Sequence, residues 1–153
     1  MSNKTLSVAA IQNGTVIDHI NSGQAIRIIH LLNLLGKKHR VTIGLNLPSK
    51  HMKYKDIIKI EDHALKNEEA NEITVFAPEA TINIIQNFEV VQKITTTLPP
   101  HIADVFVCPN PICITRTEPV ATFFNIESQG KQINLICKYC EKAFDRNAVQ
   151  VKI

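Results

Sequence analysis

The chain has 153 residues, a length that suits one compact domain or two small ones and excludes a large multidomain enzyme. Hydrophobic residues make up 44% of it and charged residues 20%, which is the composition of a folded protein and not of a disordered one. Seventeen basic and 14 acidic side chains give a formal net charge of +3, too small to predict nucleic-acid binding from overall electrostatics. Any site for an anion must therefore be local.

No segment has the length and hydrophobicity expected for export or membrane insertion. Only a few apolar residues precede Gln12, which is too few for a signal peptide. The longest apolar stretch, residues 25–35, is interrupted by Arg27, His30 and Asn33 and is too short to span a bilayer. The sequence therefore predicts a cytoplasmic protein without a membrane partner.

Periodic hydrophobic patterns and turn residues predict seven elements in the first two thirds of the chain. In chain order they are a strand or bulged pair over 5–20, a helix capped at 21–22 and ending at 35, strands over 41–47 and 56–61, a helix over 67–73, and strands over 80–85 and 88–94. This order resembles a ferredoxin-like α+β sandwich with an antiparallel sheet. Prolines at 99 and 100 end the last strand and predict a linker, so domains are expected at 1–98 and 99–153.

The first predicted helix carries more apolar residues than one core-facing stripe needs. Leu31 and Leu34 lie outside the stripe that Ala25 begins and Leu35 ends. Two interpretations are open: the helix is fully internal, or it buries a second face against a partner chain. Together with the alternating strand over 41–47, the second interpretation predicts a homodimer.

All four cysteines fall in the last third of the chain, as the pair Cys108 and Cys113 and the pair Cys137 and Cys140. A C-x4-C pair followed by a C-x2-C pair aims four thiolates at one point, which suits a tetrahedral Zn²⁺ ion. No histidine follows His101, so a metal held here has four sulfur ligands and no open position for catalysis. We therefore predict one structural Zn²⁺ per chain, in a small β-rich domain of the zinc-ribbon or rubredoxin-like kind that draws much of its folding free energy from the ion.

These cysteines also allow alternatives to a metal site. They can form two disulfides or remain four free thiols, although disulfides are disfavoured in a reducing cytosol. A redox-active Cys137-x-x-Cys140 motif would indicate a thiol oxidoreductase, yet such a motif normally stands alone. The third alternative is a zinc-ribbon module that binds nucleic acid. Residues 101–153 hold six Lys or Arg against five Asp or Glu, a balance too even for phosphate-backbone affinity.

Three charged residues in predicted strands are candidates for a nucleotide site. Lys59 and Lys93 lie in apolar strands, where most lysines simply face water. If they converged with Asp18, the lysines would hold phosphates while the carboxylate accepted hydrogen bonds from a ribose. Asp18 and His19 are neighbours, so alternation places them on opposite faces and argues against a shared acid–base site. The glycines are too scattered for a P-loop or a Rossmann fingerprint.

Several segments together carry a family likeness. A strong resemblance to the regulatory chain of aspartate carbamoyltransferase is found in residues 14–20 (GTVIDHI), 42–49 (TIGLNLPS), 55–61 (KDIIKIE) and the cysteine segments CPNPIC and CKYCEK. The likeness runs in register from about Val8 to the C-terminus. It implies an N-terminal nucleotide-binding allosteric domain and a C-terminal zinc domain, the same division that the cysteine placement indicates.

The resemblance also implies roles for individual residues. The implied contacts are Ala10 and Ile11 for the base, Asp18 and Lys59 for the ribose, His19 and Lys93 for the phosphates, and Val16, Asn83, Ile85, Phe88 and Val90 for the pocket lining. The implied effectors are the nucleoside triphosphates ATP, CTP and UTP. On this basis the chain binds a nucleotide without turning it over.

The resemblance finally implies partners and a mechanism. The chain would form homodimers and contact the catalytic chains of aspartate carbamoyltransferase through its zinc domain, and it would carry no catalysis of its own. Effectors would favour one of two quaternary states by binding it more tightly, and so shift the activity of a distant active site in pyrimidine biosynthesis. Nucleic acid is not an expected partner.

Overall fold

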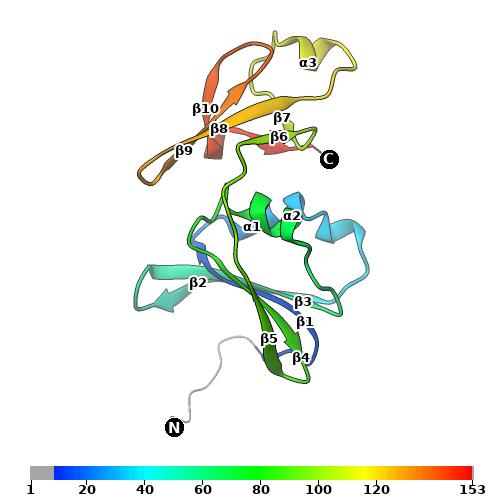
Figure 1. The fold of residues 1–153 in the computed structure, drawn as a ribbon, viewed down its shortest axis with the longest axis vertical. Coiled ribbons are helices and arrows are strands. Elements are labelled where there is room, and N and C mark those ends of the chain that lie inside the picture. The colour runs from blue at the N-terminus through cyan, green and yellow to red at the C-terminus, as the bar shows by residue number, and fades with distance from the viewer. Residues whose placement is uncertain (1–8, 153) are drawn as a thin grey trace. The chain divides into compact units, whose positions relative to one another are not determined.

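The computed structural model of the chain describes residues 9–152 (Figure 1). The chain divides into two compact units, residues 1–96 and 97–153, and each is considered by itself. Both units are built on antiparallel sheets and contain few, short helices, which confirms the predicted α+β class. Within the described residues, no helix has the length and apolar character that crossing a bilayer requires.

The first unit follows the βαββαβ order of the ferredoxin-like fold, with one strand added. Its elements are β1 (Gly14–Asn21), α1 (Ala25–Leu31), the 3₁₀ turn η1 (Leu34–Gly36), β2 (Val41–Ser49), β3 (Lys53–Glu61), α2 (Asn67–Ile73), β4 (Thr81–Gln86) and β5 (Glu89–Ile94). The sheet order is β2-β3-β1-β4-β5, and every neighbouring pair is antiparallel. Strand β5 is the addition, and it forms one edge of the sheet while β2 forms the other.

Helices α1 and α2 lie on one face of this sheet (Figure 1). The strands send a row of directly opposed isoleucines toward that face. The row consists of Ile58 on β3, Ile17 on β1, Ile82 on β4 and Ile94 on β5. All four are buried, and burying each side chain contributes about 1.5–3 kcal/mol. The alternate residues of the same strands therefore point to the opposite face, which we call the open face.

Helix α1 is shorter than predicted. The sequence predicted a helix ending at Leu35, but α1 ends at Leu31 because Asn33 adopts a left-handed conformation with φ of 53°. Asparagine tolerates this conformation better than most residues and often ends helices. Leu34 is then buried at 4% exposure, whereas Leu35 is 76% exposed. The sequence had predicted Leu35 in the core-facing stripe and Leu34 outside it. Leu34 therefore belongs to the core of its own unit and offers no second helix face to a partner.

The start of α1 is held by a strand residue and not by the predicted caps. Asp56 on β3 is completely buried, and its Oδ2 accepts hydrogen bonds from the backbone N–H groups of Gly23 at 2.9 Å and Ala25 at 3.2 Å. Its Oδ1 accepts from the N–H of Asn46 at 2.9 Å. Ser22, a predicted cap, instead donates its hydroxyl to the side chain of Asn46. The carboxylate satisfies N–H groups that a helix start leaves unpaired, and it ties α1 and β2 to β3.

Strand β1 also differs from its prediction. It begins at Gly14, residues 9–13 lie outside any strand, and the predicted strand residues 5–8 lie outside the described part of the chain. A bulge interrupts β1, because the pairing with β3 shifts between Ile17 and Ile20. The prediction of strand structure is therefore wrong for residues 9–12, and the break expected at Gly14 is instead a bulge between Ile17 and Ile20.

The second unit contains two small sheets. Its elements are β6 (His101–Ala103), β7 (Phe106–Val107), α3 (Ile114–Thr117), β8 (Phe123–Gln129), β9 (Gln132–Cys137), β10 (Ala143–Asp145), the 3₁₀ turn η2 (Arg146–Ala148) and β11 (Gln150–Val151). Four strands form the sheet β10-β9-β8-β6, and β11 pairs with β7. The core centres on Phe106 and Phe124, whose rings meet edge to face at 6.2 Å, and on Leu135. A core this small needs a further source of stability.

Replacing Asp56 with Ala is expected to destabilise the first unit by about 3 kcal/mol or more, because three backbone N–H groups lose their charged acceptor. Urea denaturation of the full chain measures the change. The matched control is Glu89→Ala at the exposed start of β5, which should stay within about 0.5 kcal/mol of the wild type. Equal stability of Asp56→Ala and this control would contradict the capping role.

Candidate functional site

The four cysteines meet at one point in the second unit. Their sulfur atoms all lie within 4.8 Å of one another. Cys108 Sγ is 3.7 Å from Cys140 Sγ, and Cys113 Sγ is 3.8 Å from Cys137 Sγ. Four sulfurs at about 2.3 Å from a tetrahedral metal stand about 3.8 Å apart, whereas a disulfide requires about 2.05 Å. The geometry fits a four-sulfur metal centre and not a pair of disulfides.

Each cysteine pair is closed by a backbone hydrogen bond. The N–H of Cys113 donates to the carbonyl of Asn110 at 3.1 Å, and the N–H of Glu141 donates to the carbonyl of Cys137 at 2.8 Å. Glu141 takes a left-handed conformation with φ of 61°, which completes the second turn. These short turns direct the two thiols of each pair toward the same point, as their spacing predicted.

The thiols differ in their surroundings. Cys108, Cys113 and Cys137 are buried, whereas Cys140 is partly exposed. Burial raises the pKa of the Cys108 and Cys137 thiols. Burial acts in the same direction on Cys140, but a hydrogen bond from the backbone of Lys142, together with bonds from neighbouring side chains, outweighs it and lowers the pKa of Cys140 to about 7. The thiols of Cys108 and Cys137 hold a proton unless a cation compensates the thiolate, so the cluster suits a bound metal ion.

Three supporting residues of the metal centre were not predicted from the sequence. Asn110 is buried between the first two cysteines. Thr115 Oγ1 lies 3.2 Å from Cys113 Sγ, and Arg116 Nη1 donates to the carbonyl of Cys108 at 2.8 Å. The available signal was their position, because all three lie inside or just after the C-x4-C turn.

The open face of the first unit carries several of the predicted nucleotide-contacting residues. The strand register places Lys59 on β3, Val16 on β1, Asn83 on β4 and Lys93 on β5 directly opposite one another. Directly opposed residues share a face of the sheet, so these four form one cross-strand row. Three strand spacings of about 4.8 Å separate the ends of the row, and the two lysine backbones are therefore about 14 Å apart. Such a distance suits separate contacts along one extended ligand.

Alternation places Asp18 on the same face as Val16, and the bulge in β1 brings His19 to this face as well. Asp18 is opposed to Thr81 on β4, and His19 Nδ1 lies 3.0 Å from Thr81 Oγ1. Strict alternation predicted opposite faces, but His19 has a φ of 56° within the register shift, and a bulge interrupts the alternation. Asp18 also forms an ion pair with Lys55 at 3.0 Å, on the strand that carries Lys59. Lys55 was not predicted as a site residue; its place four residues before Lys59 was the available signal.

Lys59 is buried although it lies on the open face. It is 7% exposed, and its Nζ donates to the carbonyl of Ala9 at 2.7 Å. Burial lowers the pKa of Lys59, and the charge of Asp18 acts in the opposite direction. The segment before β1 therefore lies against this lysine. In that segment Ala10 is exposed and Ile11 is buried.

The remaining predicted lining residues lie toward the β4–β5 turn. Ile85 on β4 is opposed to Val90 on β5 and shares the face of Asn83 by alternation. Ile85 is 8% exposed, whereas Val90 and Phe88 are 51% and 64% exposed. Exposed apolar side chains beside a row of polar ones are the combination that a nucleobase and its sugar require.

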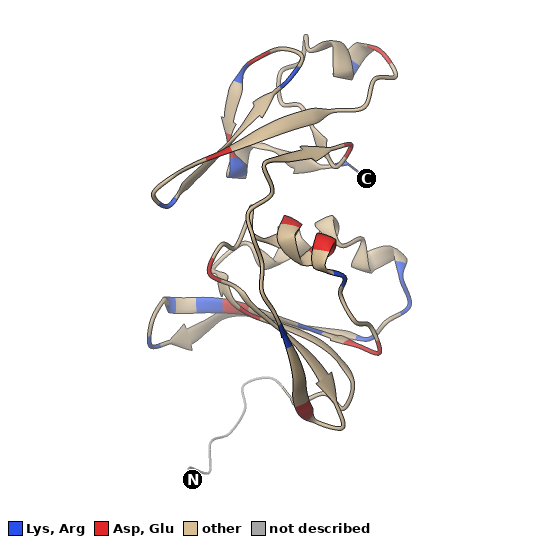
Figure 2. Ribbon diagram, viewed as in Figure 1, with Lys and Arg blue, Asp and Glu red and all other residues tan. Residues whose placement is uncertain are grey.

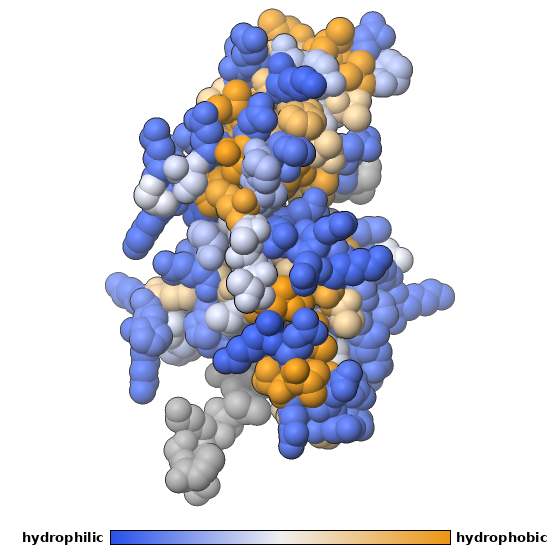
Figure 3. Space-filling view, in the orientation of Figure 1, coloured by the Kyte–Doolittle hydropathy of each residue, from blue (hydrophilic) through white to orange (hydrophobic). Residues whose placement is uncertain are grey.

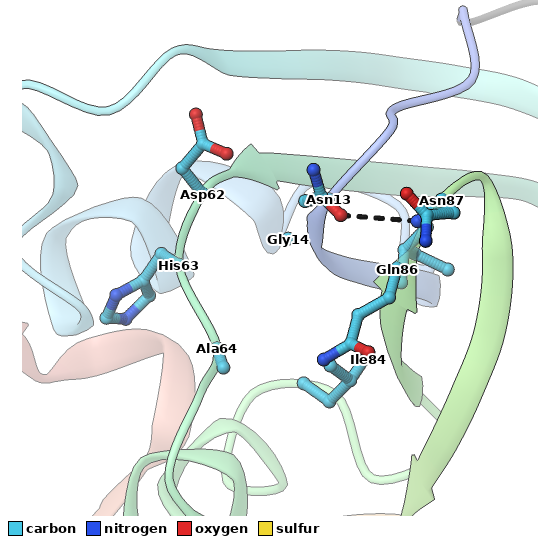
Figure 4. A pocket seen from close by; sticks show the side chains of 9 residues that line it. Asn13, Gly14, Asp62, His63, Ala64, Ile84, Gln86 and Asn87 are labelled. Atoms are coloured by element: carbon cyan, nitrogen blue, oxygen red, sulfur yellow. Dashed lines mark hydrogen bonds between the residues drawn. The ribbon is translucent and has the colours of Figure 1, made fainter.

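A cavity of about 390 Å³ lies beside the start of β1 (Figure 4). Its lining consists of Asn13, Gly14, Asp62, His63, Ala64, Ile84, Ile85, Gln86 and Asn87. None of these nine described residues is Lys or Arg, so the cavity is not suited to phosphates, and Ile85 alone belongs to the predicted nucleotide set. The ring of His63 points away from the cavity, and its Nε2 is buried without a hydrogen-bond partner in the described structure. Burial lowers the pKa of His63.

The charged residues of the first unit are grouped by sign. Figure 2 shows Lys and Arg gathered at the β2–β3 hairpin and acidic residues on α2. Lys55, one of this basic group, lies on the open face and forms an ion pair with Asp18. The small net charge of the chain therefore does not exclude a local basic region, which lies in the same unit as the candidate site.

Both units match models of one protein family. Residues 6–97 match the model described as aspartate carbamoyltransferase regulatory chain, allosteric domain, and residues 100–150 match the model of the metal binding domain of the same chain. The chain belongs to this family. The resemblance found in the sequence is confirmed, and the second unit is a metal-binding domain.

Individual relatives agree over almost their whole length. The aspartate carbamoyltransferase regulatory chain of Baumannia cicadellinicola is 52% identical over 145 residues, which cover 95% of this chain and 93% of the relative. Those of Chromobacterium violaceum and Serratia marcescens are 48% and 47% identical, with 94% or more of each chain covered. Family membership makes the chain a regulatory subunit that takes part in allosteric regulation of pyrimidine biosynthesis.

Proposed function

We propose that this chain is a non-catalytic regulatory subunit that binds nucleoside triphosphates on the open face of its first unit and transmits their effect to the catalytic chains of aspartate carbamoyltransferase. The observation that carries the proposal is the cross-strand row of Lys59, Val16, Asn83 and Lys93. This row provides a cation at each end and an apolar and an amide side chain between them, in the allosteric domain of the family.

Different residues of the open face are proposed to contact different parts of the nucleotide. Lys93, exposed on the edge strand, and His19 provide donors to the phosphates, and the carboxylate of Asp18 accepts from ribose hydroxyls. Backbone groups of Ala10 and Ile11 recognise the base. A backbone N–H or carbonyl has a fixed donor or acceptor character, and this lets it distinguish bases that differ in their exocyclic groups.

The lining residues provide the apolar part of the site. Val16, Ile85, Phe88 and Val90 offer contact area to the base and the sugar, and Asn83 contributes a donor and an acceptor between the two lysines. Phe88 is exposed and lies where the β4–β5 turn meets the segment before β1, since its N–H donates to the carbonyl of Gln12 at 2.9 Å. An exposed ring is available for stacking on a base.

The bound metal in the second unit is proposed to be one structural Zn²⁺, held by Cys108, Cys113, Cys137 and Cys140. The tetrahedral spacing of four sulfurs is the arrangement that structural zinc prefers. Four thiolates fill the coordination sphere and leave no position for an activated water. We infer that the chain has no catalytic activity at the metal.

The surface around the cysteine turns is proposed to contact the catalytic chains. Ile112 and Ile114 flank Cys113 and are 82% and 50% exposed, and Tyr139 beside Cys140 is 43% exposed. Apolar surface is visible near α3 in Figure 3. Grouped exposed apolar residues are typical of protein–protein interfaces. Because the same turns hold the sulfurs, the metal maintains the shape of this surface.

Transmission requires that an effector prefer one of two quaternary states. An effector that binds one state ten times more tightly than the other shifts the equilibrium between the two states by up to tenfold, which corresponds to about 1.4 kcal/mol of coupling. The open face and the cysteine turns belong to different units, so the subunit separates effector recognition from contact with the catalytic chain.

A homodimer through the first unit is also proposed, on narrower grounds than the sequence suggested. Leu34 no longer supports it, because this side chain is buried in its own unit. Strand β2 still does, because it is an edge strand and exposes Ile43 at 39% and Leu45 at 48%. An unpaired edge with apolar side chains is a site where a second copy can add its strand.

Elemental analysis of the purified chain is expected to find one zinc per chain. Cys140→Ser should weaken metal binding and unfold the second unit while the first stays folded, because each unit has its own core. Hydrogen exchange read separately over residues 9–96 and 97–152 checks this, with the exposed Ser128→Ala as control. Folded protein that contains no metal would refute the proposal.

Lys93→Ala is expected to weaken nucleotide binding by about ten- to hundredfold, equivalent to roughly 1.5–3 kcal/mol, through loss of a charge-assisted contact to the phosphates. Calorimetry with ATP, CTP and UTP on the full chain measures this. The control is Lys66→Ala, an exposed lysine just before α2 that should bind as the wild type does. Equal affinities in both variants would remove Lys93 from the site, and a wild type that binds no nucleotide would overturn the proposed function.

Leu45→Lys should shift the full chain from dimer toward monomer in analytical ultracentrifugation, because it places a charge on the proposed β2 interface. A change of at least tenfold in the dimer dissociation constant is expected, on the order of 1.4 kcal/mol. Leu35→Lys, at a more exposed leucine on η1, is the control and should have no effect. A wild-type chain that sediments as a monomer at tens of micromolar, roughly where modest interfaces persist, would count against the dimer.

A further inference from the structure

Two histidine rings meet in the first unit, at the end of β2 and β3 that lies opposite their hairpin. The rings of His39 and His63 have centroids 5.0 Å apart and planes inclined at 40°. His39 lies two residues before β2 begins, and His63 lies two residues after β3 ends. The antiparallel pairing of these strands brings the two positions together, and the N–H of Glu61 donates to the carbonyl of Arg40 at 2.9 Å beside them.

The backbone holds His63 in place. Its carbonyl accepts a hydrogen bond from the hydroxyl of Thr15 at 2.6 Å, and the oxygen of that hydroxyl accepts from the N–H of Leu65 at 3.2 Å. Thr15 is completely buried in β1. Helix α2 follows, and its start is capped by a bond from the N–H of Lys66 to Glu69 Oε1 at 3.1 Å. The imidazole of His63 is therefore carried by a segment with fixed ends.

The contact between the rings leaves one nitrogen of His63 unsatisfied. Its Nε2 is buried and has no hydrogen-bond partner within the part of the chain that the structure describes. Native proteins provide partners for almost all buried polar atoms, because an unpaired one is unfavourable. A neutral imidazole carries a lone pair on one of its nitrogens, and histidine is the commonest protein ligand of transition metals.

The separation of the rings matches the one that a shared metal ion requires. A metal lies about 2.0–2.1 Å from a ligating imidazole nitrogen, and therefore about 3.2 Å from the centre of that ring. Two rings at a tetrahedral angle around one ion then have centroids about 5.2 Å apart, close to the 5.0 Å observed. We propose that His39 and His63 bind a divalent transition-metal ion such as Zn²⁺ at a site separate from the four cysteines, with water in the remaining positions.

The donor set and the nearby charges determine which ion binds and how tightly. Imidazole nitrogens suit Zn²⁺, Ni²⁺ and Cu²⁺, whereas Mg²⁺ and Ca²⁺ require oxygen ligands. Glu69 on α2 attracts a cation at His63, and Lys37 and Lys66 on the adjoining loops repel one. The site is thus selective for transition metals but weaker than the cysteine cluster. The purified chain should still contain one zinc, and the histidine pair should fill only when metal is added.

A metal at this site has a structural consequence within the first unit. It connects the loop before β2 to the loop between β3 and α2, two segments that are more than twenty residues apart in the sequence. An ion that binds the folded chain and not the unfolded one stabilises the fold, and it restricts the opening of the segments that carry its ligands.

Calorimetric titration of Zn²⁺ into the full chain tests the site, with nucleotide absent and the cysteines already carrying their zinc. The wild type should bind one further Zn²⁺ per chain, and excess Mg²⁺ should not compete. His39→Gln and His63→Gln should each weaken this binding by about tenfold or more. The double variant should bind little more weakly than either single variant, because both imidazoles act on one ion.

The matched control is His51→Gln, which removes an exposed histidine at the hairpin between β2 and β3 and should bind the further ion as the wild type does. A wild type that binds no further Zn²⁺ would overturn the proposal. Equal weakening by the control and by the two paired variants would overturn it as well, since it would indicate loose binding at surface histidines. Neither outcome depends on whether the chain binds nucleotides.

Hydrogen exchange on the wild type locates the ion without any substitution. Added Zn²⁺ should slow the exchange of amides at residues 37–40 and 62–66 by several-fold and leave the amides of β8 and β9 unchanged. Protection that appears elsewhere, and not in these two loops, would contradict the assignment to His39 and His63. This measurement decides the question even if a histidine variant does not fold.

Discussion

The register of the five-stranded sheet determines both the core of the first unit and its candidate site. A slip of one residue in β3 or β5 against its neighbour would turn Lys59 or Lys93 toward the helices and take Ile58 or Ile94 out of the core. Burial of the isoleucines opposes this slip. The apolar side chains that stabilise the sheet on one face therefore also hold the polar row in place on the other.

The second unit depends on a different constraint. Its core is small, and burial raises the pKa of the Cys108 and Cys137 thiols, so a thiolate at either position is unfavourable without a cation. The turns that carry the sulfurs are closed by backbone hydrogen bonds and also carry exposed apolar residues, among them Ile112 and Tyr139. Metal binding therefore supports both the folding of this unit and the position of these exposed apolar residues. The first unit obtains its stability from a sheet and two helices and has no such requirement.

Local patterns in the sequence were sufficient for the features that depend on local spacing. The cysteine spacing predicted the sulfur cluster, and the alternation of apolar residues predicted most strands. The shared face of Lys59 and Lys93 was only a condition at that point, because it depends on how four strands pair. What the sequence did not indicate depends on contacts between distant residues. Asp56 caps α1 from another strand, His19 lies in a bulge that breaks the alternation, and Lys59 binds a carbonyl fifty residues away. The early end of α1 at Asn33 is an intermediate case, because an Asn in a helical pattern is a known but weak stop signal.

The position of Lys93 has a mechanical consequence. This residue is the second last of β5, and the second unit begins at Thr97, four residues later along the chain. Four extended residues span about 14 Å at most, so a ligand that pulls on Lys93 acts close to the covalent exit from the sheet. Lys59, at the other end of the row, lies on a central strand that the isoleucine core holds firmly. A ligand that contacts both lysines is therefore held at one end by a central strand of the sheet. At the other end it is held close to the segment that links the two units.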